Sequence, residues 1–187
     1  QKRCTTGKSL KDLEQAVSIG HLERFAADWE RKTGNNTLPE VKSETGKKVA
    51  IVGSGPASLM AAVDCRKEGH TVVLFEAFHK LGGVMRYGIP EFRLPNSIID
   101  HELEAIEALG ISIVKNFVVG RTRKIKDMLT HDGFDALFIG SGAGLPNFMG
   151  IPGEDAVGVF TANEYLTRAN LMNGHDTELA ATPMYPS

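Results

Sequence analysis

Apolar residues recur along this chain in two ways, and each predicts a different kind of element. In residues 18–32 they stand three or four positions apart, which predicts an amphipathic helix. The apolar positions of that helix are Ile19, Leu22, Phe25, Ala26 and Trp29. Residues 33–46 are polar and contain glycine, asparagine and proline, as linkers do. We therefore expect a helical arm and linker at residues 1–46 and a separate domain at residues 47–187.

The second domain opens as strand, helix and strand. Residues 49–52 and 71–75 are short apolar runs, which predict strands. The segment between them, residues 56–68, has helical spacing. This alternation is typical of an α/β fold with a parallel sheet and flanking helices.

The remainder of the domain continues the same alternation after an irregular segment. Residues 77–95 contain three glycines and two prolines, so we expect no regular element there. Residues 96–109 return to helical spacing, and Gly110 ends that helix. Residues 111–114 and 136–139 predict two more strands, and the second is continuously apolar, as buried parallel strands are.

Composition narrows the class of protein. The 187 residues carry a formal charge of −2 with both signs interspersed, so nothing favours nucleic acid or an anionic membrane as a partner. No run of about 18 apolar residues predicts a spanning helix. The two cysteines, Cys4 and Cys65, indicate no disulfide framework, and we expect a cytoplasmic protein. Because the chain begins with Gln1, we expect a fragment of a longer protein.

A glycine turn, Gly53-Ser-Gly55-Pro-Ala-Ser58, follows the first predicted strand and opens the helix. In a dinucleotide-binding fold Gly53 would allow the tight turn, and Gly55 would let the backbone approach a pyrophosphate. Pro56 suits the first helical turn, and the helix N-terminus offers free N–H groups to phosphates. Ser58 stands at the third glycine position, where a small residue allows close packing of helix and strand.

Glu76 closes the second predicted strand, about 20 residues after the glycine turn, where a carboxylate accepts hydrogen bonds from an adenosine ribose. An acid at this place disfavours a ribose 2′-phosphate, so NADP is less favoured here than FAD or NAD. The residues alone leave FAD and NAD both open.

The segment Leu81-Gly-Gly-Val-Met-Arg-Tyr-Gly-Ile-Pro-Glu-Phe-Arg-Leu-Pro95 resembles the glutamate synthase small (beta) subunit family. That family includes the large subunit of NADH-dependent ferredoxin:NADP oxidoreductases, sulfide dehydrogenase and the flavin region of dihydropyrimidine dehydrogenase. The resemblance covers nearly the whole chain and continues through residues 116–120, 133–146, 150–154 and 162–172. It implies a Rossmann-like FAD-binding domain, preceded by a short helical arm from an iron–sulfur domain.

The resemblance also implies which residues bind FAD. The pyrophosphate would be held by the first glycine turn, through Gly53, Gly55, Pro56, Ala57 and Ser58. Glu76 would bind the adenosine ribose, Arg93 would offer its guanidinium to flavin or phosphate oxygens, and Val119 would present its backbone to adenine. The segment along the pyrophosphate and ribityl chain would be Gly82, Gly83 and Val84. Contact with the dinucleotide is further implied for Gly140, Ser141 and Gly142.

Glycines 140, 142 and 144 follow a predicted strand but do not predict a second nucleotide turn. Pro146 and Gly150 prevent an apolar helix from opening there. Members of the resembled family carry their NAD(P)H domain after the region that this chain matches. We therefore expect the electron donor's site to be absent from it.

Family members begin with a cysteine-rich helical domain that binds [4Fe–4S] clusters, and Cys4 matches its last ligand. Such a cluster ordinarily needs four thiolates, so this chain cannot build one by itself. Cys4 is therefore either a ligand in a longer parent or an isolated free thiol.

The resemblance implies that the parent protein passes electrons from NADPH through FAD to iron–sulfur centres and a partner. That partner would be the glutamate synthase large subunit or another redox subunit. The six histidines are scattered, and no side chain is expected to act as acid or base. Two alternatives stay open: a subunit of an electron-bifurcating ferredoxin:NADP oxidoreductase or sulfide dehydrogenase, and a folded but inactive binding or docking module.

Overall fold

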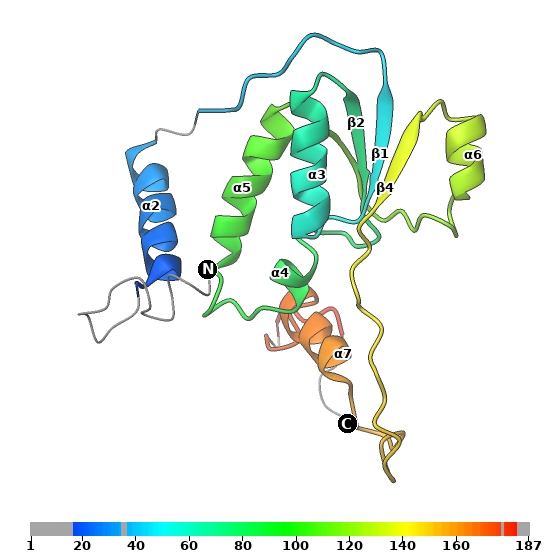
Figure 1. Ribbon diagram of the computed structural model, residues 1–187. Coiled ribbons are helices and arrows are strands. Elements are labelled where there is room, and N and C mark those ends of the chain that lie inside the picture. Colours follow the sequence, from blue (N-terminus) through cyan, green and yellow to red (C-terminus); the bar gives the residue numbers. More distant parts are fainter. Residues whose placement is uncertain (1–16, 35–36, 177, 183–187) are drawn as a thin grey trace. The chain divides into compact units, whose positions relative to one another are not determined.

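The computed structural model describes residues 17–34, 37–176 and 178–182 (Figure 1). The chain divides into two compact units that meet between Leu38 and Pro39, and each is described by itself. Cys4 lies outside the described residues. The predicted division at Gly46 into an iron–sulfur arm and a FAD domain therefore stays a prediction.

The first unit contains helix α2 (Ile19–Thr33), which confirms the amphipathic helix predicted for this region. The helix ends where Gly34 adopts a left-handed conformation and donates its N–H to the carbonyl of Glu30 at 3.1 Å. None of its residues is buried, and the rings of Phe25 and Trp29 stack on each other with centroids 6.3 Å apart.

The second unit is built on a four-stranded parallel sheet with the strand order β3-β2-β1-β4. The strands are β1 (Lys48–Val52), β2 (Thr71–Phe75), β3 (Ser112–Val114) and β4 (Ala136–Ile139). The helices that accompany them are α3 (Pro56–Lys67), α5 (Asn96–Ala108) and α6 (Ile125–Thr130). The predicted α/β fold with a parallel sheet and flanking helices is confirmed.

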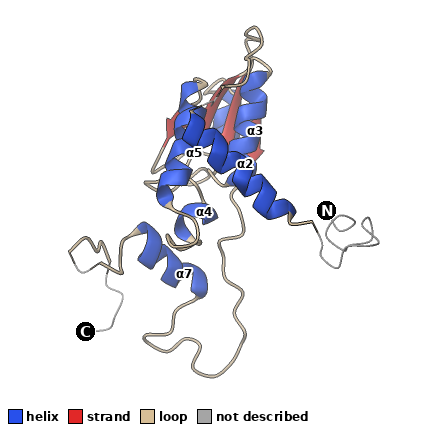
Figure 2. Cartoon of the chain, turned by 90° about the vertical axis from the view of Figure 1, so that its left-hand side faces the viewer, coloured by secondary structure: helices blue, strands red, loops and turns tan. Residues whose placement is uncertain are grey.

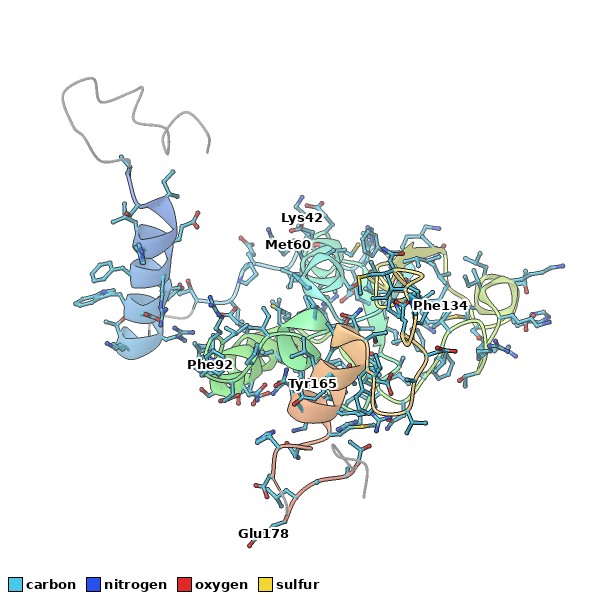
Figure 3. The ribbon with its side chains drawn as sticks, turned by 90° about the horizontal axis from the view of Figure 1, so that it is seen from below. Lys42, Met60, Phe92, Phe134, Tyr165 and Glu178 are labelled. Carbon is cyan, nitrogen blue, oxygen red and sulfur yellow. The ribbon has the colours of Figure 1, made fainter. Side chains whose placement is uncertain are left out.

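Alternation along the central strand divides the core into two clusters, one on each face of the sheet. Val49 and Ile51 pack with the buried residues of α3 and α5, and Figure 2 shows these two helices together on one face. Ala50 belongs to the other cluster, with Met128 of α6 and with Phe134, which Figure 3 labels. Because side chains on both faces of β1 are packed in the core, the end of this strand, where the next turn begins, is held in place.

Strand β4 departs from its predicted burial. Phe138 is 39% exposed and Ile139 is 59% exposed, so the expectation of a buried strand was wrong. Within the described residues β4 pairs only with β1 and forms an edge of the sheet. The continuous apolar run therefore predicted a strand correctly, but it predicted the burial of that strand wrongly.

Residues 77–95 also differ from expectation, because they contain a short helix, α4 (Val84–Tyr87). Gly82 and Gly83 precede it with φ of +115° and +54°, which reverses the chain just before the helix starts. In Figures 1 and 2, α4 lies beyond the end of α3 at which that helix begins.

After β4, residues 140–161 form neither helix nor strand. This confirms that no helix opens after Gly140. The chain then forms α7 (Ala162–Leu166), which continues into a π-helical turn, η1 (Thr167–Leu171). Asn170 of η1 donates its side-chain N–H to the carbonyl of Tyr87 at 3.0 Å, which ties this segment to α4. No helix in the described part of the chain is long and apolar enough to cross a membrane.

Candidate dinucleotide-binding site

The first glycine turn begins at Gly53, directly after β1. Gly53 has a φ of +94° and donates its N–H to the carbonyl of Phe75 at 2.8 Å. A Cβ added at Gly53 would lie 2.5 Å from the carbonyl oxygen of Gly140, closer than real Cβ atoms come to such atoms. Both the backbone conformation and the neighbouring chain therefore require glycine at this position.

Gly55 is different, because the protein's own packing does not require it. Its φ is −71°, and a Cβ added there would meet nothing within 4 Å. Gly55 precedes the first turn of α3, where Pro56 and Ala57 are exposed. Open space in front of a helix N-terminus is what a pyrophosphate needs in this kind of fold. The geometry therefore fits a bound dinucleotide at this turn.

Ser58 replaces the third glycine and is fully buried. Its hydroxyl oxygen lies 3.3 Å from the carbonyl oxygen of Val52 and 3.2 Å from that of Gly140. A Cβ added at Gly140 would approach the Ser58 hydroxyl to 2.2 Å. The serine thus links α3 to the ends of β1 and β4, and the close packing expected at this position is present.

Glu76 lies just beyond β2 and is 5% exposed. One carboxylate oxygen accepts the backbone N–H of Phe78 at 2.9 Å, and the other accepts the hydroxyl of Ser54. Ser54, in turn, accepts the backbone N–H of Gly82 at 3.0 Å. The acid is therefore held by the first glycine turn and by the backbone two residues further on, and Ser54 links it to the second glycine segment.

The second glycine segment lies directly against the first. A Cβ added at Gly83 would lie 2.7 Å from the Cα of Gly55. One added at Gly82 would meet the side chains of Arg86 and Ile99, each at 3.2 Å. The structure thus brings together two segments that the sequence separates, and Val84, which is 48% exposed, follows them.

Two residues at this site were missed from the sequence. Ser54 is 1% exposed, and its only sequence signal was its place between the two glycines. Arg86 is 6% exposed and donates its Nε to the carbonyl of Leu81 at 3.2 Å. Its guanidinium also donates to Asn96 at 2.9 Å and forms an ion pair with Asp100, both on α5. The spacing of arginines in a glycine-rich segment gives no sign of which one is buried.

The other predicted residues differ in their surroundings, and among them the backbone of Gly140 and Ser141 lies against Gly53. Arg93 is exposed, and within the described residues no side-chain hydrogen bond or ion pair is recorded for it. Val119 is half-buried beside the second core cluster, in a turn after β3. Gly140 donates its N–H to the carbonyl of Val52 at 2.9 Å, whereas Ser141 and Gly142 are exposed. The contacts of all these residues with a cofactor stay predictions.

Metal and thiol chemistry have little support in the described residues. No group of three or more histidine, cysteine or acidic side chains there could hold a metal ion. Cys65 lies in α3, and burial raises the pKa of its thiol, which disfavours the reactive thiolate.

Strand, glycine turn, helix and terminal acid together define a Rossmann-like domain of the class that binds FAD or NAD(P). The sequence profile of the family described as pyridine nucleotide-disulphide oxidoreductase matches residues 47–181, and the chain belongs to this family.

Relatives within this family are subunits of redox enzymes. The chain is 35% identical to the NAD-dependent dihydropyrimidine dehydrogenase subunit PreT of Escherichia coli K12, over 93% of this chain and 41% of PreT. It is 36% identical to the glutamate synthase [NADPH] small chain of Bacillus subtilis, over 89% of this chain and 33% of that protein. The chain therefore spans about two fifths or less of these relatives.

Solved structures show the same fold. Mycobacterium tuberculosis FprA in complex with NADPH has a TM-score of 0.56 and 26% sequence identity, over 65% of this chain and 28% of FprA. A complex of 2-naphthoyl-CoA reductase has a TM-score of 0.54, also with 26% identity, over 70% of this chain and 19% of the reductase.

Proposed function

We propose that this chain is the FAD-binding segment of an NAD(P)H-dependent flavoprotein oxidoreductase of the glutamate synthase small-chain type. The observation that carries the proposal is the meeting of the two glycine segments at Gly55 and Gly83, beside the buried acid Glu76. Open space remains at Gly55, so the site has room for a pyrophosphate at the start of α3.

Each part of the site has a distinct task in this proposal. The first turn, Gly53–Ser58, holds the pyrophosphate through backbone N–H groups and the positive end of the α3 dipole. Glu76 accepts hydrogen bonds from the adenosine ribose. The segment from Gly82 to Val84 lies along the pyrophosphate and ribityl chain, and Arg93 and Val119 contact the flavin or phosphate oxygens and the adenine. Gly140, Ser141 and Gly142 border the dinucleotide from the end of β4.

FAD supplies the redox chemistry when bound, because flavins accept hydride from NAD(P)H and pass electrons to iron–sulfur centres. The protein's residues bind and orient the cofactor, and none of the described side chains is assigned to acid or base catalysis. We favour FAD over NAD because residues 81–95 resemble the glutamate synthase small-subunit family, whose members hold FAD at the first glycine turn.

FAD binding can be tested on the 187-residue chain itself by titration with FAD, followed through flavin absorbance at roughly 370 and 450 nm. We expect saturable uptake, and we expect Glu76→Ala to weaken it about tenfold or more, because a charge-assisted hydrogen bond is lost. Glu104→Ala on the exposed surface of α5 is the matched control, with unchanged affinity. A chain that stays colourless would instead favour a docking module without cofactor, and unchanged affinity in Glu76→Ala would remove Glu76 from the site.

The particular enzyme is a finer proposal. Glutamate synthase small chains and PreT are similar to this chain to nearly the same degree, between 34% and 36% identity. We favour the small chain, with the glutamate synthase large subunit as partner and with Cys4 as an iron–sulfur ligand in a longer parent. Affinity capture of the parent from its own host should recover a glutamate synthase large subunit. Recovery of a dihydropyrimidine dehydrogenase, ferredoxin-linked or sulfide-linked subunit would overturn this choice and leave FAD binding untouched.

A further inference from the structure

We propose that Ser54 is a positioning residue, which fixes the carboxylate of Glu76 for the adenosine ribose and couples that contact to the second glycine segment. The inference rests on the proposed binding of FAD and deepens it. A tight turn with this geometry requires glycine at residue 53, but it makes no such demand of the next residue. The geometry of the turn therefore does not account for a serine at residue 54.

The hydroxyl of Ser54 is fixed by two hydrogen bonds. It is 1% exposed, it donates its single hydrogen to Glu76, and its oxygen accepts the N–H of Gly82 at 3.0 Å. A hydroxyl has one hydrogen to donate, so this arrangement leaves it no second donor interaction. Its orientation is therefore determined by the acid on one side and by the second glycine segment on the other.

The same contacts fix the plane of the Glu76 carboxylate. One oxygen is held by Ser54 and the other by the N–H of Phe78 at 2.9 Å. A carboxylate oxygen has two lone-pair positions, so each oxygen keeps one acceptor position after these bonds. Two acceptors in a fixed plane match the two neighbouring hydroxyls of a ribose. Without Ser54, one of these oxygens would lose its anchor.

Ser54 also joins the parts of the site to one another. Its backbone lies in the first glycine turn, its hydroxyl holds the backbone of Gly82, and Gly83 packs against Gly55. The ribose acid, the first turn and the second glycine segment are thus one connected unit. Removal of the hydroxyl should affect the ribose contact first, because the charged partner makes the stronger hydrogen bond.

The test is a double-mutant cycle in the full chain, with FAD affinity as the readout. Ser54→Ala should weaken FAD binding about tenfold, since it removes a hydrogen bond to a charged group. If the serine acts through the acid, the double variant Ser54→Ala, Glu76→Ala should bind FAD no more weakly than Glu76→Ala alone. Ser97→Ala, at an exposed position of α5, is the control and should bind FAD normally.

A second readout separates positioning from a general structural role. The unsubstituted chain should bind ADP more tightly than 2′-deoxy-ADP, and Ser54→Ala should reduce this preference. A purely structural role would weaken both ligands by the same factor and would leave the preference intact. Far-UV circular dichroism verifies that each variant is folded.

The outcomes distinguish this inference from the proposal on which it rests. If the chain binds neither FAD nor ADP, the proposed function fails and the inference fails with it. If FAD binds and depends on Glu76, but the losses from the two single variants multiply in the double variant, the inference alone is overturned. A full preference for ADP in Ser54→Ala would overturn it as well.

Discussion

The tripeptide Gly-Ser-Gly occurs twice in this chain, each time directly after one of two neighbouring parallel strands. At residues 53–55 it makes a tight turn with a buried serine and opens a helix of 12 residues. At residues 140–142 the serine is exposed, and neither helix nor strand follows before Ala162. The same three residues, each time after a strand of the same sheet, thus form a tight turn that begins a helix in one case and an irregular, exposed segment in the other.

The difference comes from what surrounds each tripeptide. The first is followed by Pro56 and a helix whose residues Leu59 and Ala62 are buried against the sheet, so burial stabilises the helix that the turn begins. The second is followed by more glycine and by Pro146, and it leaves a strand at the sheet edge. A glycine pattern therefore indicates a binding turn only together with the elements on both sides of it.

The largest difference in stability between the two tripeptides is expected when Gly53 in the first and Gly142 in the second are each replaced by alanine. Gly53→Ala adds a Cβ 2.5 Å from a carbonyl oxygen at a φ of +94°, and we expect it to destabilise the second unit by at least about 3 kcal/mol. Gly142→Ala has a φ of +72° but meets nothing within 4 Å, so it should cost only about 1 kcal/mol. Urea unfolding followed by far-UV circular dichroism measures both. Equal losses would show that the two turns are equally constrained.

The buried Arg86 lies beside the second glycine segment, which packs on the first tripeptide, and no buried arginine is described beside the second tripeptide. Arg86→Ala removes hydrogen bonds to Leu81 and Asn96 and an ion pair with the half-exposed Asp100, so we expect a loss of about 2 kcal/mol. Arg121→Ala, at an exposed position, should change the free energy of unfolding by less than about 0.5 kcal/mol. Thermal unfolding of the two variants gives the contrast, and similar midpoints would contradict the anchoring role of Arg86.

The strand before the second tripeptide is anchored at its start, and that anchor should depend on pH. Asp135 accepts hydrogen bonds from the side chain of Lys47 and the backbone N–H of Lys48, and these interactions lower the pKa of its carboxyl. A lowered folded-state pKa contributes stability above the ordinary value, about pH 4, and this stability is lost as the pH falls through the lowered pKa. Asp135→Asn should therefore be less stable than the unsubstituted chain at pH 6, and the gap should narrow as the pH falls below about 4.

Unfolding midpoints at several pH values measure this gap. Asp155→Asn, at an exposed position after the second tripeptide, is the matched control for the substitution itself. A constant difference for Asp135→Asn from pH 6 to pH 2 would mean that the charge of this carboxyl does not contribute.

The smallest effect is expected in the open segment itself. Val157 is 98% exposed, so Val157→Ala should change the free energy of unfolding by less than about 0.5 kcal/mol. Val72 is 1% exposed in the core cluster under α3 and α5, and Val72→Ala should cost about 2 kcal/mol. A large loss in Val157→Ala would reveal that the segment after the second tripeptide is packed in solution.

The spacing of apolar residues along the chain predicted the helices and strands of this fold well. The strands near residues 49–52 and 71–75 and the helices near 56–68 and 96–109 appear within about one residue of their expected bounds. These segments combine a clear period with a clear start or stop signal, such as Pro56 or Gly110. The first glycine turn and its adjacent acid were predicted for the same reason, because their spacing is a property of neighbouring elements.

What the sequence did not reveal depends on contacts between distant segments. Burial of β4 depends on whether a further strand pairs with it, and its four apolar residues carry no such information. Arg86 was missed because its partners on α5 lie 10 and 14 positions further along the chain. Ser54 was missed because its partners, Glu76 and Gly82, come together only when the sheet and the second glycine segment are in place.

The hydrogen bonds of Glu76 have a consequence for the speed of cofactor capture. Both oxygens of its carboxylate accept hydrogen bonds from the protein itself, and the second glycine segment packs on the first. Little conformational entropy is then lost on binding at this half of the cofactor. In the proposed complex with FAD, association should be set by diffusion and orientation, and substitutions at these residues should change mainly the lifetime of the complex.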